Sequence, residues 1–324
     1  MAIRTELSEA ELAEVAEAWG LGNLASARGL PEGSINTLYR LETASGHYVL
    51  RLSEGRAEPE IQFETALVAH LQASRYPAVV LVPRADGRPY GVVKQRFACV
   101  FQLAAGEHVD PRRMTTAQAL DSGRLLGRLH VVTESFPGRL QNRYGPPAIR
   151  AMVSSILARP AETMGADLRD ARPLLEREAA RLDLLPAADE GVLHADWFPD
   201  NLLFLGDRLA TVLDFEMACR GPYVLDLATA VHAGCYDDGY VPARARSLVA
   251  GYLEERRLSQ AEKAALFPWA CFCALRFTAT RVLDFHLDPL GGDKLLKKDW
   301  RRFRDRLTAT LAMGEKGFAD LCGL

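Results

Sequence analysis

The chain has 324 residues, of which 48% are hydrophobic and 25% are charged. This length suits two domains, or one domain of two lobes, with enough apolar residues for a substantial core. The net charge of −3 excludes a strong basic field, so neither nucleic acid nor an anionic membrane is expected as a partner. The six cysteines are not arranged as a disulfide framework, the apolar runs are shorter than a membrane span, and no signal peptide is recognisable, so a cytoplasmic protein is expected.

The first predicted elements are a helix and a three-stranded meander. Ser8 and Glu11 form a capping-box pattern that opens a helix over 8–19. Residues 24–53 then carry three strand-like runs separated by two turns, which predicts an antiparallel sheet.

The first of these turns, residues 31–34, is small and polar. Such a turn is either a surface hairpin or a loop whose backbone N–H groups face the phosphates of a nucleotide. Because it precedes a strand with a basic residue, we assign Gly33, Ser34 and Asn36 to nucleotide binding.

The basic residue of the third run is Arg51, and the helix predicted over 59–74 carries Glu64. Phosphoryl transfer requires a cation on the nucleotide phosphates and a helix carboxylate that fixes this cation. We therefore predict an Arg51–Glu64 pair. The alternative is a strand-edge arginine and a solvated glutamate, whose pairing would contribute little.

A change from strand to helical pattern follows residue 103. Residues 79–105 hold two or three further strands, and a polar, turn-rich segment comes next. This predicts an N-terminal nucleotide-binding lobe at 1–103 and a C-terminal catalytic and acceptor-binding lobe at 104–324. Backbone groups near Phe101 and Leu103 would hydrogen-bond adenine at the hinge.

Helical periodicity dominates the C-terminal half, with helices predicted over 116–134, 148–158 and 167–183. His130 lies on the apolar side of the first of these helices. It is interpreted as a core histidine and not as a functional base, because no acid is near it in sequence.

The stretch from 191 to 214 carries the chemistry. His194, Asp196 and Asn201 are spaced H-x-D-x-x-x-x-N after an apolar run, and Asp214 ends the next strand-like segment. Phosphoryl transfer uses one carboxylate for the acceptor hydroxyl, while an Asn and a second Asp hold magnesium. Asp196 is thus the predicted catalytic base, Asn201 and Asp214 the predicted Mg²⁺ ligands, and His194 a residue that fixes the loop. An ordinary acidic strand-turn-strand is the alternative, which the spacing disfavours.

Asp226 follows at the start of another helix. It is expected to accept N–H groups of the catalytic loop or to cap its own helix, and so to support the site without taking part in chemistry.

Arginines on a long helix predicted over 259–287 are candidates for binding the acceptor. Arg276 or Arg281 could hold a substrate carboxylate, or could pair structurally with Asp284 or Asp288. The basic run at 294–306 is expected to be a solvated helix face.

Two further acids are assigned to the acceptor site. Asp200 either touches substrate or stabilises the turn beside Pro199, and Glu216 closely follows the predicted metal ligand Asp214.

The stretches GVLHADWFPDNLLFLGDRLATVLDF and ALRFTATRVLDF resemble the aminoglycoside phosphotransferase and choline kinase superfamily, and within it the bacterial homoserine kinases of that fold. The resemblance implies an α+β, protein-kinase-like bilobal fold, with a small antiparallel-sheet lobe and a larger, mostly helical lobe. It also implies ATP and Mg²⁺ as cofactors, with Asp196 as base and Asn201 and Asp214 as metal ligands. Arg51 stands where many members carry Lys.

We expect a small-molecule kinase that phosphorylates a hydroxyl of an amino-acid-like alcohol, homoserine first. A kinase for choline, ethanolamine or an aminoglycoside is an alternative, in which acids would line a cation site. The acids considered are Asp200, Glu216, Asp237, Asp238 and Asp284. A catalytically silent nucleotide-binding module is a third possibility, and the oligomeric state is left open.

Overall fold

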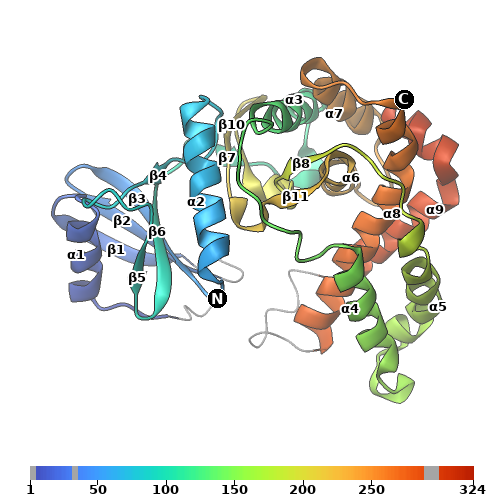
Figure 1. Cartoon of the computed structure of the whole chain (residues 1–324), viewed down its shortest axis with the longest axis horizontal. Coiled ribbons are helices and arrows are strands. Elements are labelled where there is room, and N and C mark those ends of the chain that lie inside the picture. Colours follow the sequence, from blue (N-terminus) through green and yellow to red (C-terminus); the bar gives the residue numbers. More distant parts are fainter. Residues whose placement is uncertain (1–4, 31–35, 288–298) are drawn as a thin grey trace.

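The computed structural model describes residues 5–30, 36–287 and 299–324. An antiparallel sheet with two helices forms the N-terminal part, and a larger helical assembly forms the C-terminal part (Figure 1). This arrangement agrees with the α+β, two-lobed prediction. No helix among the described residues is long and apolar enough to cross a membrane.

The N-terminal sheet has the strand order β1-β2-β3-β6-β4, and β5 also pairs with β6. All its pairings are antiparallel, as the meander pattern predicted. The strands are β1 (Leu24–Leu30), β2 (Thr37–Thr43), β3 (Gly46–Ser53), β4 (Leu81–Val82), β5 (Gly91–Val93) and β6 (Arg96–Gln102).

Each face of this sheet is covered by one helix. α1 (Glu9–Ala18), which the Ser8–Glu11 capping box opens, packs on one face against Leu50 and Leu52 of β3. α2 (Glu58–Ala73) covers the other face and lies between the sheet and the helical part (Figure 1). Successive strand residues point to opposite faces, so Arg51 faces α2 because its two leucine neighbours face α1.

The C-terminal part is built around a fully buried helix, α6, whose residues all lie in the core. This part contains α3 (Thr116–Val132), α4 (Pro146–Ala158), α5 (Ala166–Ala180), α6 (Tyr223–Gly234), α7 (Pro242–Glu255), α8 (Gln260–Arg281) and α9 (Arg301–Cys322). Short 3₁₀ turns complete it: η1 (Pro111–Arg113), η2 (Ala161–Thr163), η3 (Leu182–Leu184), η4 (Pro199–Asn201) and η5 (Phe215–Met217).

α3 and α7 approach each other closely because glycines face one another at their contact. A Cβ atom added at Gly123 would lie 1.8 Å from the carbonyl oxygen of Leu248, and one at Gly251 would lie 1.9 Å from that of Leu120. Since no real side chain tolerates such distances, the separation of the two helices depends on both glycines.

Two small sheets present the catalytic stretch. One pairs β8 (Glu190–Leu193) with β11 (Cys219–Pro222), and the other has the order β10-β9-β7. The strands of the second sheet are β7 (Glu107–His108), β9 (Leu202–Leu205) and β10 (Arg208–Val212). The predicted strand, loop and hairpin of residues 191–214 is therefore confirmed.

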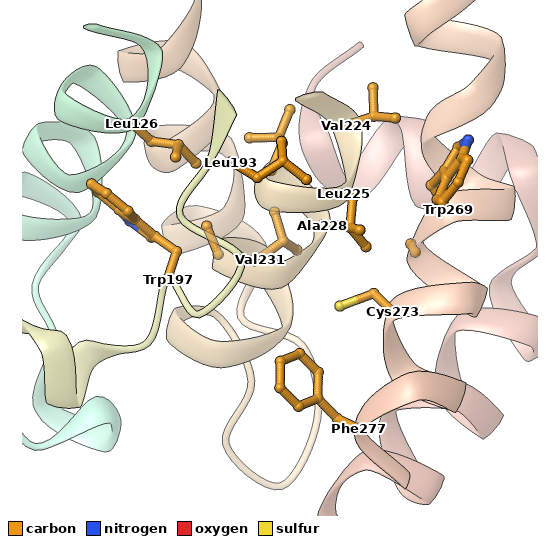
Figure 2. Packing of buried hydrophobic residues seen from close by; sticks show 14 of the residues in the cluster. Leu126, Leu193, Trp197, Val224, Leu225, Ala228, Val231, Trp269, Cys273 and Phe277 are labelled. Carbon is orange, nitrogen blue, oxygen red and sulfur yellow. The ribbon is translucent and has the colours of Figure 1, made fainter. Parts of the chain in front are cut away.

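Trp197 ties the loop after β8 to the helical core. Its ring is buried and points toward Leu126 of α3, while Leu193, Leu225 and Val231 fill the space beside α6 (Figure 2). The indole N–H of Trp197 donates to Ser122 Oγ at 2.9 Å.

Two predictions near the C-terminus are corrected. The helix expected over 259–287 stays α-helical only to Arg281, and a π-helical segment (Val282–Leu287) follows it. The run 294–306, part of which lies outside the described residues, is not a solvated face, because Phe303 and Arg306 are buried. The many basic residues of this run made its buried face, which packs against α8, unrecognisable in the sequence.

Candidate active site

The loop that leads to Asp196 is held by the side chain of Asp226. The carboxylate accepts the N–H of His194 at 2.7 Å and that of Ala195 at 2.8 Å. Ala195 has φ of 63°, in the left-handed region that is uncommon for residues other than glycine. Asp226 thus supports the loop, as the sequence predicted.

His194 joins this loop to the end of β10. Its Nδ1 accepts the backbone N–H of Asp196 at 3.3 Å. Its Nε2 lies 2.9 Å from the carbonyl oxygen of Leu213, which can only accept, so the ring donates from Nε2. The prediction that His194 fixes the loop by hydrogen bonding is confirmed.

Asn201 connects Asp196 with Asp214. Its amide nitrogen donates to Asp196 Oδ2 at 3.1 Å and to the carbonyl oxygen of Asp196 at 2.9 Å. The backbone carbonyl oxygen of Asn201 accepts the N–H of Leu213 at 2.8 Å, and Leu213 immediately precedes Asp214. The three residues with predicted catalytic and metal-binding roles therefore lie together.

Asp214 has the properties of a carboxylate that could bind a cation. Its backbone is left-handed, with φ of 57°, and its Oδ1 is buried with no hydrogen-bond partner among the described residues. Burial first, and then the charge of Glu216, raise the pKa of Asp214 well above its ordinary value, although Arg51 opposes this. A divalent ion would relieve both effects, so the donor set fits Mg²⁺.

Among the described residues, no three His, Cys, Asp or Glu side chains are close enough together to hold a metal by themselves. An ion at Asp214 would therefore depend on the amide oxygen of Asn201 and on oxygens that a ligand supplies.

Arg51 and Glu64 form the predicted pair. Arg51 donates to both oxygens of Glu64, at 2.8 and 2.7 Å, and its Nη1 lies 3.8 Å from Asp214 Oδ1. Burial raises the pKa of Glu64, but Arg51 and then Arg56 outweigh it, so the net effect is a lowered pKa. β3 and α2 thus hold the guanidinium group of Arg51 in a fixed position beside Asp214.

Arg56 was missed in the sequence. It donates to Glu64 Oε2 at 2.6 Å from the segment that precedes α2, so one buried carboxylate serves two guanidinium groups. A basic residue eight positions before the helix acid predicted to pair with Arg51 was the only signal available in the sequence.

Asn36, at the start of the described segment that leads into β2, contacts the C-terminal lobe. Its amide nitrogen lies 2.5 Å from Glu216 Oε2, and its amide oxygen accepts the N–H of Glu54 at 3.2 Å. Glu216, which was predicted to bind the acceptor, therefore contacts a residue that was predicted to bind the nucleotide. Gly33 and Ser34 lie outside the described residues.

The two predicted hinge residues lie at the end of β6. Phe101 pairs with both β3 and β4, and the guanidinium carbon of Arg51 lies 5.2 Å from the centre of its ring. The backbone N–H of Leu103 already donates to the carbonyl oxygen of His47 at 2.9 Å. Adenine binding at this segment stays a prediction.

Arg276 lies behind the catalytic loop. It is buried, its Nη1 donates to the carbonyl oxygen of Ala195 at 2.9 Å, and its guanidinium carbon lies 4.2 Å from the ring centre of Phe277. This bond was not foreseen in the sequence, because the two residues are 81 positions apart. Its predicted contact with substrate stays untested.

Arg281 interacts electrostatically with Asp196. Burial, reinforced by Arg302 and Arg306, lowers the pKa of Arg281 to about 10, whereas Asp196 acts in the opposite direction. Its guanidinium carbon lies 4.5 Å from the ring centre of Phe303, and its Nη1 donates to the carbonyl oxygen of Asp299 at 3.2 Å. A partly desolvated positive charge therefore lies close enough to Asp196 to interact with it.

Three of the five acids proposed for a cation site, Asp200, Asp237 and Asp238, are exposed or are paired with arginines. Asp200 is exposed in η4, Asp237 forms an ion pair with Arg244, and the side chain of Asp238 is 92% exposed. Asp288, a predicted partner of the arginines, lies outside the described residues.

Comparison with known proteins agrees with this geometry. A family model described as "Phosphotransferase enzyme family" matches residues 26–262. A homoserine kinase of Nitrobacter hamburgensis is 35% identical over 300 residues, which cover 90% of this chain and 89% of that protein. A homoserine kinase of Rhizobium meliloti is 34% identical over 304 residues, 92% of this chain and 91% of the relative.

Solved structures agree on the fold. A spectinomycin phosphotransferase in complex with ADP and spectinomycin superposes with a TM-score of 0.71, covering 96% of this chain and 100% of that one, at 13% sequence identity. The protein-kinase-like bilobal fold expected from the sequence is thereby confirmed. Because the family model spans most of the chain and its relatives match nearly end to end, the chain belongs to the phosphotransferase enzyme family.

Proposed function

We propose that this protein is an ATP- and Mg²⁺-dependent kinase that transfers the γ-phosphoryl group to the hydroxyl of homoserine or a similar amino-acid-like alcohol. The observation that carries the proposal is the link from Asp196 through Asn201 to the backbone beside Asp214, at 3.1 and 2.8 Å. The homoserine kinases that match 90% or more of the chain support the choice of acceptor.

Asp196 orients the acceptor hydroxyl and receives its proton as the new O–P bond forms and the bond to the leaving ADP oxygen breaks. A loose transition state asks little basicity of this carboxylate, so its main contribution is orientation. The Asn201 amide fixes one of its oxygens, which leaves the other for the hydroxyl.

Asn201 and Asp214 are the residues that would hold magnesium. When bound, the ion neutralises charge that develops on the phosphate oxygens. The Oδ1 of Asp214 is buried beside other acids and has no hydrogen-bond partner among the described residues, which supports this assignment.

Arg51, with Glu64, is assigned to the phosphates of the nucleotide. An arginine retains the charge of the usual lysine, but its planar fork is committed to Glu64 at two points, which restricts where a phosphate can approach. The turn with Gly33, Ser34 and Asn36 would cover the phosphates, and backbone groups near Phe101 and Leu103 would receive adenine.

On the acceptor side we assign the carboxylate of homoserine to Arg281. Its desolvated guanidinium near Asp196 favours an anionic group, because the neighbouring arginines leave the region positive. Arg276, Asp200 and Glu216 are weaker candidates for direct contact. The six cysteines are all free and buried in described parts of the chain, which favours a cytoplasmic setting where ATP is available.

A kinase for choline, ethanolamine or an aminoglycoside is less well supported. A cationic acceptor needs converging acids, whereas Asp237 is paired with Arg244, and Asp238 is highly exposed and paired with Arg112. The positive region at Arg281 would repel such an acceptor.

The decisive experiment is a panel of acceptors in a coupled ADP-release assay, with and without Mg²⁺. We expect turnover with homoserine and none without the ion. Turnover with choline but not homoserine would reverse the choice of acceptor. Binding of Mg²⁺-ATP without turnover on any hydroxyl compound would instead favour a silent nucleotide-binding module.

A further inference from the structure

A buried chain of hydrogen bonds leads away from the catalytic loop. Asp226 Oδ2, which accepts the N–H of His194, also lies 3.2 Å from His130 Nε2. His130 Nδ1 lies 2.8 Å from Tyr252 Oη, and Arg256 Nη1 donates to that hydroxyl at 3.2 Å. Asp226, His130 and Tyr252 are all 0% exposed, so water cannot substitute for any of these bonds.

The chemistry of the groups fixes the direction of this chain. Asp226 is a carboxylate that accepts two backbone N–H groups, so the hydrogen between it and His130 must be on Nε2. Nδ1 is then an acceptor and takes the Tyr252 hydroxyl, whose oxygen accepts from Arg256. Every donor therefore points toward Asp226, and each bond polarises the next in the same direction.

The electrostatics favour the same neutral ring. Burial lowers the pKa of His130, while Asp226 opposes this and Arg256 acts with it. The groups that face the ring from the packed elements are Asp226 and Tyr223 on α6, Tyr252 on α7 and Arg256 after it. The ring centre of Tyr223 lies 4.5 Å from that of His130, and Glu262 of α8 is bonded to Arg256 at 2.8 Å. A protonated ring would have to donate from Nδ1, which would reverse the Tyr252 bond and deprive the tyrosine hydroxyl hydrogen of this acceptor.

The chain of hydrogen bonds ends at Ala195, the residue that precedes the proposed catalytic base Asp196. Asp226 holds the N–H of Ala195 at 2.8 Å, and Ala195 has the left-handed φ of 63° that sets the backbone into Asp196. We propose that His130 is a positioning residue for phosphoryl transfer: acting through Asp226, it keeps Ala195 in this conformation and so aims Asp196. This inference rests on the proposed function.

A second buried histidine provides a contrast. His232 lies on α6, whereas His130 lies on α3, and it is likewise 0% exposed. Its Nδ1 lies 2.7 Å from the hydroxyl of Tyr240, and its Nε2 lies 2.9 Å from the carbonyl oxygen of Ala270. It has the same burial and the same kind of tyrosine partner, but its chain ends on α8 and not on the catalytic loop. His232 is therefore a matched control.

The test compares His130→Gln with His130→Asn. A glutamine amide nitrogen lies near the position of Nε2 and can still donate to Asp226, whereas that of asparagine lies near Nδ1 and cannot reach it. We expect the Gln variant to keep kcat within about threefold and the Asn variant to lose about tenfold or more, with the KM of both substrates nearly unchanged. His232→Asn should lower Tm to a similar extent and keep kcat.

Equal kcat losses in the Gln and Asn variants, or a loss confined to KM, would overturn the proposal. If the Asn variant does not fold, Tyr252→Phe replaces it: a kcat decrease of about threefold supports the chain, and an unchanged kcat contradicts it.

The tautomer of His130 gives a readout that does not depend on activity. Nitrogen-15 NMR of the wild-type protein should report a neutral ring with hydrogen on Nε2 at pH 7. An Nδ1–H tautomer in a fully active enzyme would overturn the inference alone, whereas absence of turnover on every acceptor would overturn it together with the proposed function.

Discussion

At the scale of single residues, the position of Asp196 depends on the bond from Asn201 and on the conformation of Ala195. Asp196→Asn keeps the size of the side chain but removes the charge that orients and deprotonates the acceptor. We expect kcat to fall by about a factor of 100 or more, while ADP binds within a few-fold of wild type. The coupled assay measures the first quantity and calorimetry the second.

Asp170→Asn, in an exposed part of α5, is the control and should leave kcat unchanged. Near-normal turnover in the Asp196 variant would remove the role assigned to this carboxylate.

Asp214 makes a prediction about stability and pH. Its pKa in the folded chain lies above the ordinary 3.8, so the folded state binds this proton more tightly than the unfolded chain does. The stabilising effect is complete below that ordinary value and is lost as the pH rises through the raised pKa. At neutral pH the ionised group therefore destabilises the protein when no cation is bound.

We accordingly expect Asp214→Asn to raise Tm by a few degrees in the absence of Mg²⁺ and to abolish turnover. The gain in Tm should shrink as the pH falls through the raised pKa of Asp214, because the wild-type side chain then also becomes neutral. Thermal unfolding across this pH range checks both points, and a lower Tm at neutral pH would contradict them.

The site residues that could be predicted from sequence are those close together in it. Asp196, Asn201 and Asp214 share one strand-loop-hairpin, so their spacing carries information. Arg276, which bonds to Ala195 from 81 positions away, left no comparable signal. His130 was read as a core histidine for want of a nearby acid, and its acid lies 96 positions along the chain.

At the scale of elements, one ion pair joins β3 to α2. Glu64→Gln would leave two guanidinium groups, Arg51 and Arg56, without their carboxylate in a buried place. We expect the free energy of unfolding to fall by about 3 kcal/mol and the KM for ATP to rise, because Arg51 would lose its fixed position. Chemical denaturation and steady-state kinetics measure the two effects.

Glu58→Gln is the matched control, since Glu58 is an exposed acid at the start of the same helix. Its effect on the free energy of unfolding should stay within about 0.5 kcal/mol. If the two substitutions lowered the free energy of unfolding equally, the buried Arg51–Glu64 pair would stabilise the protein no more than an exposed acid does.

Helix starts were predictable because their signals are local. Capping boxes at Ser8, Thr115 and Ser259 mark the first turns of α1, α3 and α8. Where α8 passes into the π-helical segment at Val282, no Gly or Pro marks the change. The buried face of α9 was likewise hidden, because its arginines look solvated until α8 is placed beside it.

At the scale of the molecule, several hydrogen bonds among the described residues join the two lobes. Residues of the segment before β4 bond to β10, with Val79 N donating to Val212 O at 2.9 Å and Val212 N to Pro77 O at 2.8 Å. Across the cluster of catalytic acids, Asn36 of the N-terminal lobe contacts Glu216.

Asn36→Asp would place two carboxylates against each other across the lobes. We expect the KM for ATP to rise about threefold to tenfold with little change in kcat, because the repulsion opposes closure over the nucleotide. The double variant Asn36→Asp with Glu216→Gln should recover most of the loss. Failure to recover would show that the two residues are not coupled.

The order of strands followed by helices was enough to predict a two-lobed α+β molecule, because each type of element has its own period. How the lobes meet was not predictable, since it depends on contacts such as Asn36 with Glu216, which are 180 positions apart.

The glycine contact between α3 and α7 has a consequence for attempts to increase the thermal stability of this enzyme. Exchanging helical glycines for alanine is a common route to heat resistance, because it reduces the freedom of the unfolded chain. Here a methyl group at residue 123 or 251 would collide with a carbonyl oxygen and wedge the helices apart. Ser122, next to Gly123, would move with the strained backbone and weaken its bond to Trp197, so the displacement would reach the neighbouring Asp196.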